Sequence, residues 1–311
     1  SELRVARRFQ GGLRGEIDKI HEELQLAASV QREFLPRKLP QADTVDIQLY
    51  YRPAGYVSGD IYDVQKLDDH HLGFFVADAV GHGVPAALMT MVLLRSLTTT
   101  VPGPEGRTIL PPGAVLENLN NEMILRHGDV PRFATAAYGI VDTRDRTVTI
   151  AGAGHPAPVV LGPDGTRAIE TSGGLLGVFP EATFDEAEFV LQPDDMLIIY
   201  SDGFETAFPG DGADDYARRV PSNRYMHFFR QTAETWRADN LRAAMDELAG
   251  KLNAQSGSLH QIDDLTALVL VPARTTPLDR LFRGQAGKGA HAPKEPDHAQ
   301  RIDQQTRAES R

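Results

Sequence analysis

Residues 74–89 read FFVADAVGHGVPAALM, and an aspartate stands where the hydrophobic run of a buried strand would otherwise continue. Four apolar residues, 74–77, lead directly into Asp78, and a Gly-His-Gly turn centred on His82 precedes an apolar helical segment. A carboxylate beside a buried strand costs free energy unless it is paired or binds a metal ion. The stretch therefore predicts a buried strand that ends in a functional carboxylate, followed by a flexible turn and a helix.

Outward from this stretch, residues 44 to 272 show mostly the patterns of strands separated by turn residues. The expected strands are VDIQLYYRP (45–53), HLGFFVAD (71–78), FATAAYGIVD (133–142), TVTIAGAG (147–154), PAPVVLG (156–162), EAEFVL (186–191), DMLIIYSD (195–202) and LTALVLVP (265–272). Helices are expected over 84–100, 112–127 and 239–252. Many strands with few, grouped helices indicate an α+β fold in which antiparallel sheets are covered by helices.

The N-terminal segment has a heptad-like period, which predicts a long helix with one apolar stripe. The stripe comprises Leu13, Ile17, Ile20, Leu24, Ala27 and Phe34, with Gln31 in its one polar position. Pro36 and Pro40 end the helix, because proline cannot continue a helix interior. The stripe either packs against its own domain or forms a coiled-coil stalk that dimerises or transmits a signal.

These patterns divide the chain into a helical or coiled-coil linker (1–40), one large globular domain (41–272) and a tail (273–311). The tail loses the apolar pattern and is rich in Arg, Gln, Gly and Pro, so we expect it to be disordered. The first residue is Ser1 rather than Met, which is compatible with a piece of a longer protein.

The net charge, the cysteine count and the length of the apolar runs exclude several classes of protein. A formal net charge of −11 argues against a nucleic-acid-binding protein, which normally presents a basic face. No cysteine is present, so disulfides, thiolate metal sites and cysteine nucleophiles are excluded. No apolar run approaches the roughly 18 residues of a membrane span. We therefore expect a cytoplasmic protein without a membrane span.

Acidic residues recur at the ends of the expected strands. They are Asp60 and Asp63 in SGDIYD, Asp78 in VADAVGHG, Asp202 in YSDG, and Asp263 and Asp264 in QIDDLT. Any one of them alone is most simply a turn or helix cap, since aspartate favours both. Their repetition, with glycines beside them and no obvious Lys or Arg partner nearby, indicates a shared cation site instead. Carboxylates without cysteine suit Mg²⁺ or Mn²⁺, and two such ions can activate water for attack on a phosphate.

The motifs together resemble a known family. VSGDIYDV, FFVADAVGHGVPAALM, AGAGHPAPVVL, GGLLGV, LQPDDMLIIYSDGFETA and DDLTALVLV occur in the order typical of the SpoIIE-type, RsbU-like branch of the PPM (PP2C-like) protein phosphatases. The resemblance covers roughly residues 25–272. It implies an αββα sandwich of two antiparallel sheets preceded by the long helix, and a metal-dependent serine/threonine phosphatase of bacterial signalling with two Mn²⁺ or Mg²⁺ ions.

Site residues follow from the same resemblance, position by position. Asp78 would bridge both ions, and Ala79 would add its backbone carbonyl. Asp60 would hold the site from the SGD turn, and Asp202 and Asp263 would complete the second ion. Gly59, His82, Gly203 and Asp264 are secondary candidates, Asp264 being the less favoured acid of its pair. For His82 a general-acid role and a local structural role both remain open.

The resemblance also implies partners. The expected substrate is a phosphoserine or phosphothreonine protein, a STAS-domain anti-sigma-factor antagonist. The helix before the core (24–34) and the helix after GHG (85–97) would form a dimerising switch below a possible sensor domain, and 209–225 is a candidate flap. Two other functions are weighed against this one: a non-catalytic phosphoprotein- or STAS-binding module, and a nucleotidyl cyclase. The complete set of aspartates argues against the first, and the lack of a cyclase-type layout argues against the second.

Overall fold

The computed structural model describes residues 2–104, 106–126, 132–208, 221–255 and 263–274. Its contacts divide the chain into two units, Ser1–Ala273 and Arg274–Arg311. All helices and strands of the described residues belong to the first unit. The tail predicted over 273–311 falls outside the described residues from 275 on, as does most of the candidate flap over 209–225.

Two five-stranded antiparallel sheets form the centre of the first unit. Sheet A has the order β1-β12-β11-β8-β9, with β1 Val45–Arg52, β12 Leu265–Pro272, β11 Met196–Tyr200, β8 Val159–Gly162 and β9 Gly165–Ala168. Sheet B has the order β10-β7-β6-β3-β2, with β10 Glu186–Val190, β7 Thr147–Ala153, β6 Ala134–Asp142, β3 His71–Ala79 and β2 Asp60–Lys66. A small hairpin pairs β4 Thr100–Gly103 with β5 Gly106–Ile109.

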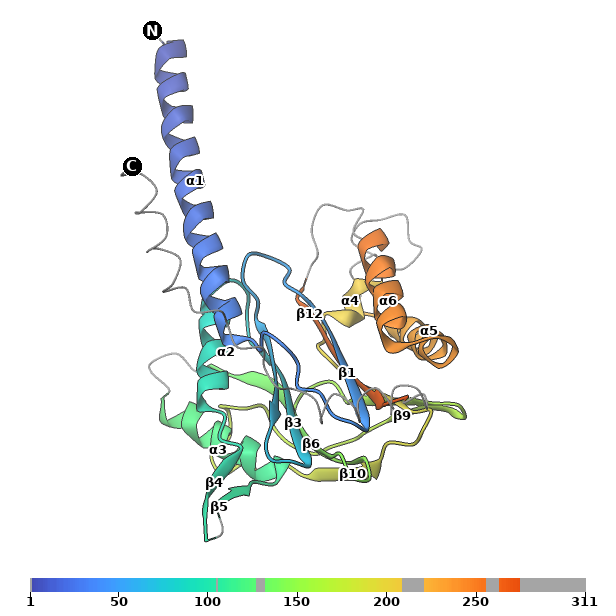
Figure 1. Ribbon diagram of the computed structural model, residues 1–311. Helices are drawn as coiled ribbons and strands as arrows, with labels where there is room; N and C mark the ends of the chain where they lie inside the picture. Colours follow the sequence, from blue (N-terminus) through green and yellow to red (C-terminus); the bar gives the residue numbers. More distant parts are fainter. Residues whose placement is uncertain (1, 105, 127–131, 209–220, 256–262, 275–311) are drawn as a thin grey trace, which may run out of the picture. The chain divides into compact units, whose positions relative to one another are not determined.

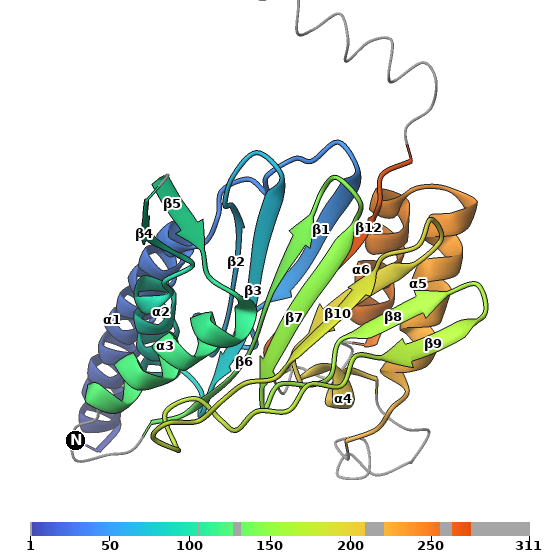
Figure 2. The same ribbon diagram turned by 90° about the horizontal axis from the view of Figure 1, so that it is seen from below.

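Helices cover the outer face of each sheet (Figures 1 and 2). On the side of sheet B lie α2 Val84–Ser96 and α3 Pro112–Leu125, with the C-terminal part of α1 Glu2–Phe34 beside α2. On the side of sheet A lie α5 Tyr225–Ala238 and α6 Leu241–Gln255, and the short α4 Phe204–Ala207 follows β11. This arrangement confirms the predicted αββα sandwich of two antiparallel sheets with a long N-terminal helix.

Two hydrophobic clusters hold the layers together. One lies around sheet B and includes Phe74 and Phe75 of β3, and the other joins sheet A to α5 and α6 and includes Phe229 and Trp236. Every residue of β12 is buried, because this strand is covered on both of its faces. A strand of that kind reads as a continuous apolar run, and LTALVLVP does so.

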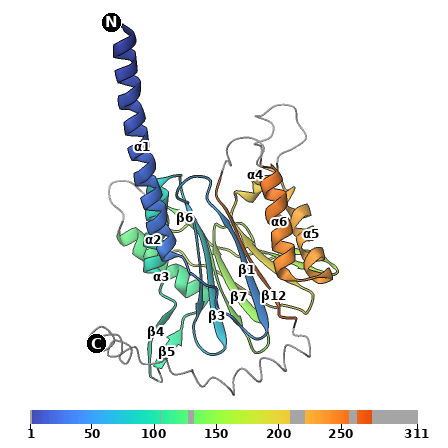
Figure 3. The same cartoon turned by 45° about the horizontal axis from the view of Figure 1, so that its top comes forward.

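The end of α1 is fastened to the rest of its unit through one buried amide. Gln31, which is 3% exposed, donates from Nε2 to the Ser58 carbonyl at 2.7 Å and accepts from the Ser58 N–H through Oε1 at 3.0 Å. Its Nε2 also lies 3.2 Å from Thr90 Oγ1 of α2. The polar position in the stripe therefore faces the protein's own domain in this structure, while the N-terminal part of α1 extends beyond the sheets (Figure 3).

Several elements differ from the predicted ones. The helix expected over 84–100 ends at Ser96, and Thr100 begins β4. The segment after the SGD turn is a full strand, β2, that starts at Asp60 itself. The prediction missed α5, although Tyr225, Phe229 and Trp236 recur at helical spacing and are all buried. Short pieces such as β9 carry too few residues to show a period.

Candidate functional site

The central pair of the site is made by two neighbouring strands. Asp60 begins β2 and lies directly opposite Asp78, near the end of β3, so both side chains point to the same face of sheet B. That face is the one toward sheet A, because Thr266 Oγ1 of β12 donates to Asp60 Oδ2 at 2.6 Å. Strand β3 thus places the Asp78 carboxylate on the side of sheet B that faces sheet A.

Burial dominates the electrostatics of this pair. Asp60 is 2% exposed, and desolvation raises its pKa to about 7 although the Thr266 hydroxyl favours the charged form. Desolvation also raises the pKa of Asp78, to about 9, with the charges of Asp60, Asp202, Asp263 and Asp264 adding to the shift. Among the residues that the structure describes, no Lys or Arg forms an ion pair with Asp60, Asp78 or Asp202. The pair therefore lacks a compensating positive charge from the described residues.

Asp202 and Asp263 lie at the exposed rim of the same site. Asp202 follows β11 and Asp263 precedes β12, which are neighbouring strands of sheet A. Desolvation raises the pKa of each carboxyl, and for Asp263 the charge of Asp202 adds to the rise while that of His82 opposes it. The exposed His82 therefore faces Asp263 closely enough to interact with it. Four of the predicted acids and His82 thus form one electrostatic neighbourhood.

Backbone oxygens surround Gly59 beside the acids. A Cβ on Gly59 would lie 3.3 Å from the Ala79 carbonyl oxygen, 3.4 Å from Asp78 Oδ1 and 3.4 Å from the Gly81 carbonyl oxygen. A side chain there would press against oxygens of a carboxylate and of two peptide groups. The Ala79 carbonyl oxygen therefore lies close to Gly59 and to the Asp78 carboxylate.

Asp264 has a different task from its neighbour. Its two carboxylate oxygens accept hydrogen bonds from the backbone N–H groups of Ala54 and Gly59, each at 2.6 Å. Gly203 packs against the backbone of the same residue, since a Cβ on Gly203 would lie 2.0 Å from the Asp264 carbonyl oxygen. These two secondary candidates hold the turns that carry Asp60 and Asp202.

The donor set is compatible with hard divalent cations. Carboxylate and carbonyl oxygens are the ligands that Mg²⁺ and Mn²⁺ prefer, and buried carboxylates with raised pKa values gain from a nearby cation. Within the described part of the chain, however, no three His, Cys, Asp or Glu side chains lie close enough together to hold one metal ion. The chemistry of these oxygen ligands suits a divalent cation, but among the described residues the acidic side chains lie too far apart to coordinate the same ion.

Two threonines beside the acids, Thr135 and Thr266, carried no signal in the sequence, and one acid, Asp63, does not belong to the site. Thr135 of β6 lies opposite Asp78, and its Oγ1 is 2.8 Å from Nδ1 of His155. Desolvation lowers the pKa of His155 to about 3, so its imidazole is neutral. Asp63 lies three residues after Asp60 and therefore on the opposite face of β2, where it neighbours Leu97.

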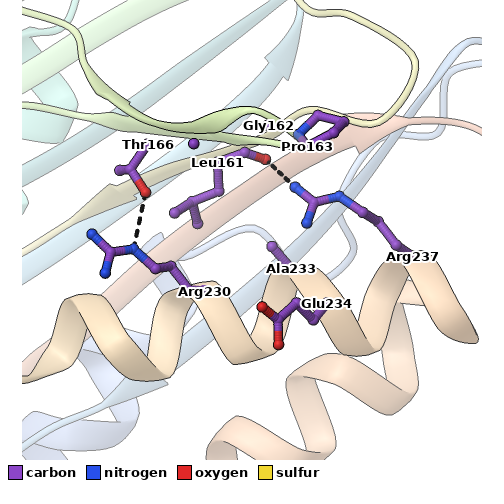
Figure 4. A pocket seen from close by; sticks show the side chains of 9 residues that line it. Leu161, Gly162, Pro163, Thr166, Arg230, Ala233, Glu234 and Arg237 are labelled. Atoms are coloured by element: carbon purple, nitrogen blue, oxygen red, sulfur yellow. Dashed lines mark hydrogen bonds between the residues drawn. The ribbon is translucent and has the colours of Figure 1, made fainter.

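A cavity of about 230 Å³ lies apart from the acids, between the β8–β9 hairpin and α5 (Figure 4). Arg237 donates to the carbonyl oxygens of Leu161 and Asp194 at 2.7 Å and 3.0 Å, and Arg230 donates to Thr166 Oγ1 at 3.2 Å. Both guanidinium groups therefore fasten the hairpin to α5.

None of the described helices is long and apolar enough to cross a membrane.

The stacked sheets with acids at one edge define a PP2C-like fold. The SiaA-PP2C domain of Pseudomonas aeruginosa has the same architecture, with a TM-score of 0.66 and 23% identity over 82% of this chain and 97% of that domain. RsbX crystallised in complex with magnesium also shares the fold, with a TM-score of 0.50 and 17% identity over 76% of this chain and 99% of RsbX. Likeness at these identities concerns the fold alone.

The family described as Stage II sporulation protein E (SpoIIE) matches residues 68–271, and the chain belongs to this family. Similar proteins include the phosphoserine phosphatases RsbU and RsbP of Bacillus subtilis (strain 168). RsbU is 32% identical over 193 residues, which are 61% of this chain and 56% of RsbU. RsbP is 28% identical over 185 residues, which are 58% of this chain and 44% of RsbP. The chain spans about half the length of these relatives.

Proposed function

We propose that this chain is a metal-dependent protein phosphatase that hydrolyses phosphoserine or phosphothreonine on a partner protein in bacterial signalling. One observation carries the proposal: the buried Asp60 and the half-buried Asp78 form a carboxylate pair without a compensating Lys or Arg among the described residues, and the charges of Asp202 and Asp263 act on Asp78. Membership of the SpoIIE family and similarity to two phosphoserine phosphatases support it.

The proposed ligands are those implied by the resemblance: Asp60, Asp78, the Ala79 carbonyl, Asp202 and Asp263, for two Mn²⁺ or Mg²⁺ ions. Divalent cations at such a site lower the pKa of water and neutralise charge on phosphoryl oxygens. The chain's own residues then have definite tasks. Thr266 orients Asp60 by its hydrogen bond, and Asp264 fixes the turn at Gly59. The neutral His155 cannot donate a proton as an imidazolium, so among the two histidines near the site only His82 suits a general-acid role.

The proposed substrate is a phosphorylated STAS-domain protein in the cytoplasm, as the SpoIIE-type resemblance implies. The acids that remain exposed, Asp202 and Asp263, leave the site open to a phosphoserine on the surface of a folded protein. A non-catalytic phosphoprotein-binding module is the second candidate, because the acidic side chains are not gathered into a closed ligand set among the described residues.

Release of inorganic phosphate separates these functions. The chain is incubated with a phosphoserine-bearing STAS-domain protein and with p-nitrophenyl phosphate, each with chelator, Mg²⁺ or Mn²⁺. We expect cation-dependent release from both substrates. Binding of the phosphoprotein without release in any cation would favour the binding module. Conversion of ATP or GTP to a cyclic nucleotide with pyrophosphate release would instead identify a cyclase and contradict the proposal.

We further propose that α1 and α2 form the interface of a homodimer and link it to an upstream sensor domain. A stripe of exposed apolar residues at helical spacing, Leu26, Val30 and Phe34, runs along the end of α1. Leu88 and Val92 form a similar exposed pair on α2, which contacts α1. Exposed apolar stripes on adjacent helices are typical of surfaces that pack against another helix pair.

Removal of residues 1–24 tests the role of the helix. We expect the truncated chain to dissociate in sedimentation measurements and to need a higher Mn²⁺ concentration for half-maximal turnover, because it loses the part of α1 that extends beyond the sheets and keeps only a short helix to hold the contacts of Gln31 with Ser58 and Thr90. Leu26→Ser with Val30→Ser in the full chain is the matched point variant. An unchanged oligomeric state and an unchanged Mn²⁺ requirement in both proteins would refute the role of this helix.

A further inference from the structure

Four exposed apolar side chains lie at the strand ends beside the acids and on the segment that pairs with β6 at Leu176. They are Val80, Phe133, Val178 and Phe179, which are 46%, 36%, 39% and 59% exposed. We call them the apolar rim. Large apolar side chains exposed together beside a functional site are a frequent mark of a surface that contacts another molecule. The position of the rim, its rigidity and the charge around it decide which molecule that is.

The rim is continuous with the site. The Val80 N–H donates to the Phe133 carbonyl at 3.1 Å, so the ends of β3 and β6 stay paired up to this point. Ala134 and Leu176 exchange two backbone hydrogen bonds of 3.2 Å and 3.0 Å, which brings the segment before Val178 alongside β6. Val80 itself stands between Ala79 and Gly81, whose carbonyl oxygens surround Gly59. A molecule that reaches the acids from this side must cover the rim.

The most exposed member of the rim stands on a fixed backbone. Asn120 of α3, fully buried, donates from Nδ2 to the Phe179 carbonyl at 2.9 Å and accepts from the Gly177 N–H at 2.8 Å. One amide side chain thus holds both ends of the turn that presents Phe179. Contacts made by a preorganised aromatic side chain lose little conformational entropy on binding. Exposed and rigid together, Phe179 has the properties of an anchor for a protein partner.

The net negative charge of the chain indicates that the apolar rim contributes affinity for a protein partner. The chain carries a net charge of −11, and the edge beside the rim gathers Asp60, Asp78, Asp202 and Asp263. Divalent cations at the acids would attract the phosphate group, but the net negative charge of the chain does not attract the remaining surface of a phosphoprotein that is not basic. Apolar contact is independent of charge and is not weakened by salt as ion pairs are. An apolar surface next to the acids therefore supplies the affinity that charge cannot.

We propose that the apolar rim is the docking surface for the folded phosphoprotein substrate, which places an apolar patch of its own beside its phosphoserine. This proposal rests on the proposed phosphatase function and specifies how that site selects proteins over small phosphate esters. Phe179 and Val178 provide the main contact, and Phe133 with Val80 continues it toward the acids.

Phe179→Ser combined with Val178→Ser tests the rim. The matched control is Val190→Ser on β10, an equally exposed valine that pairs with Thr147 at the other end of sheet B. Turnover is measured on the phosphoserine STAS-domain protein and on p-nitrophenyl phosphate. We expect kcat/KM for the phosphoprotein to fall by about tenfold or more, mainly through KM, as for loss of an aromatic anchor. The value for p-nitrophenyl phosphate should change by less than about twofold, and the control should match the wild type on both substrates.

Equal losses on both substrates would show that the rim supports the site rather than docks a protein, and no loss on either would show that it does neither. Fluorescence anisotropy of the labelled phosphoprotein on the metal-free chain decides docking without turnover. There the rim variant should bind at least about tenfold more weakly than the control. If the wild type binds in this way yet hydrolyses neither substrate, the phosphatase function fails while the docking surface stands. Dissociation of a dimer by the rim variant would identify the rim as a self-interface and overturn the proposal.

Discussion

Asp78→Asn is expected to lower cation-dependent hydrolysis of p-nitrophenyl phosphate by roughly 10²–10³-fold or more, the scale of losing a main electrostatic contribution to a transition state. Asp78 is the acid that interacts with all the others of the site, and desolvation with four neighbouring carboxylates raises its pKa to about 9. An amide keeps the shape of the side chain and removes the negative charge. A neutral side chain at the centre of the set weakens cation binding for every proposed ligand around it.

Asp63→Asn is the matched control for this variant. Asp63 is a partly buried carboxyl on the adjacent strand, with its pKa raised by desolvation, and it points to the opposite face of sheet B. Its hydrogen bond from Gln65 can also be accepted by an amide oxygen. We expect Asp63→Asn to stay within about threefold of the wild type in turnover, as is usual for a substitution away from the reacting groups. Similar losses in both variants, or full turnover by Asp78→Asn, would contradict the assignment.

Asp60→Asn is expected to stabilise the cation-free protein while it removes turnover. The pKa of Asp60 is about 7 in the folded chain, compared with about 3.9 for an unfolded aspartate. Between these values the unfolded state has released the proton that the folded state keeps, so stability falls as pH rises and the loss is complete above about pH 7. With chelator at about pH 8, the variant should melt several degrees above the wild type, since a few kcal/mol correspond to such a shift.

Two further conditions make this expectation specific. At about pH 3, below the pKa of the unfolded aspartate, Asp60 of the wild type is mostly protonated in both states, so the advantage of the variant should largely disappear. Millimolar Mn²⁺ at the higher pH should raise the melting temperature of the wild type and leave the variant nearly unchanged, because ligands that bind only the folded state stabilise it. Thermal unfolding followed by circular dichroism gives all these values. A variant that melts below the wild type with chelator at the higher pH would show that Asp60 has another buried partner.

The layers of the fold could be predicted because the main strands stand out in the sequence as apolar runs bounded by turn residues. LTALVLVP and FFVAD read as strands buried on both faces, and they lie in β12 and β3, which are interior strands of the two sheets. The acids were visible as charges that interrupt such runs. Their convergence was not visible, because it depends on which strands pair. The register that puts Asp60 opposite Asp78 is long-range information that local patterns do not contain.

The division of labour within the site was also partly hidden. Asp263 and Asp264 are adjacent acids with the same local pattern, and only the folded chain shows that Asp264 is occupied by two backbone N–H groups. The support given by Thr266 and Thr135 had no distinctive signal, since threonine is an ordinary strand residue. α5 did carry a signal, and its mixture of aromatic and polar residues concealed it. The ligand roles of Asp60, Asp78, Ala79, Asp202 and Asp263 remain predictions, and the variants above examine those of Asp60 and Asp78.

The hydrogen bonds of Gln31 make the position of α1 discrete. Ser58 is fully buried, and a single side-chain amide supplies both a donor for its carbonyl and an acceptor for its N–H. Sliding α1 by one residue, about 1.5 Å with a turn of about 100°, would put Val30 or Arg32 in that place. Valine does neither task and arginine can only donate, so each such step leaves a buried group unsatisfied at a cost of about 1–3 kcal/mol. The helix therefore has one well-defined register against the turn before Asp60. A shift by one residue in either direction raises the free energy abruptly rather than gradually.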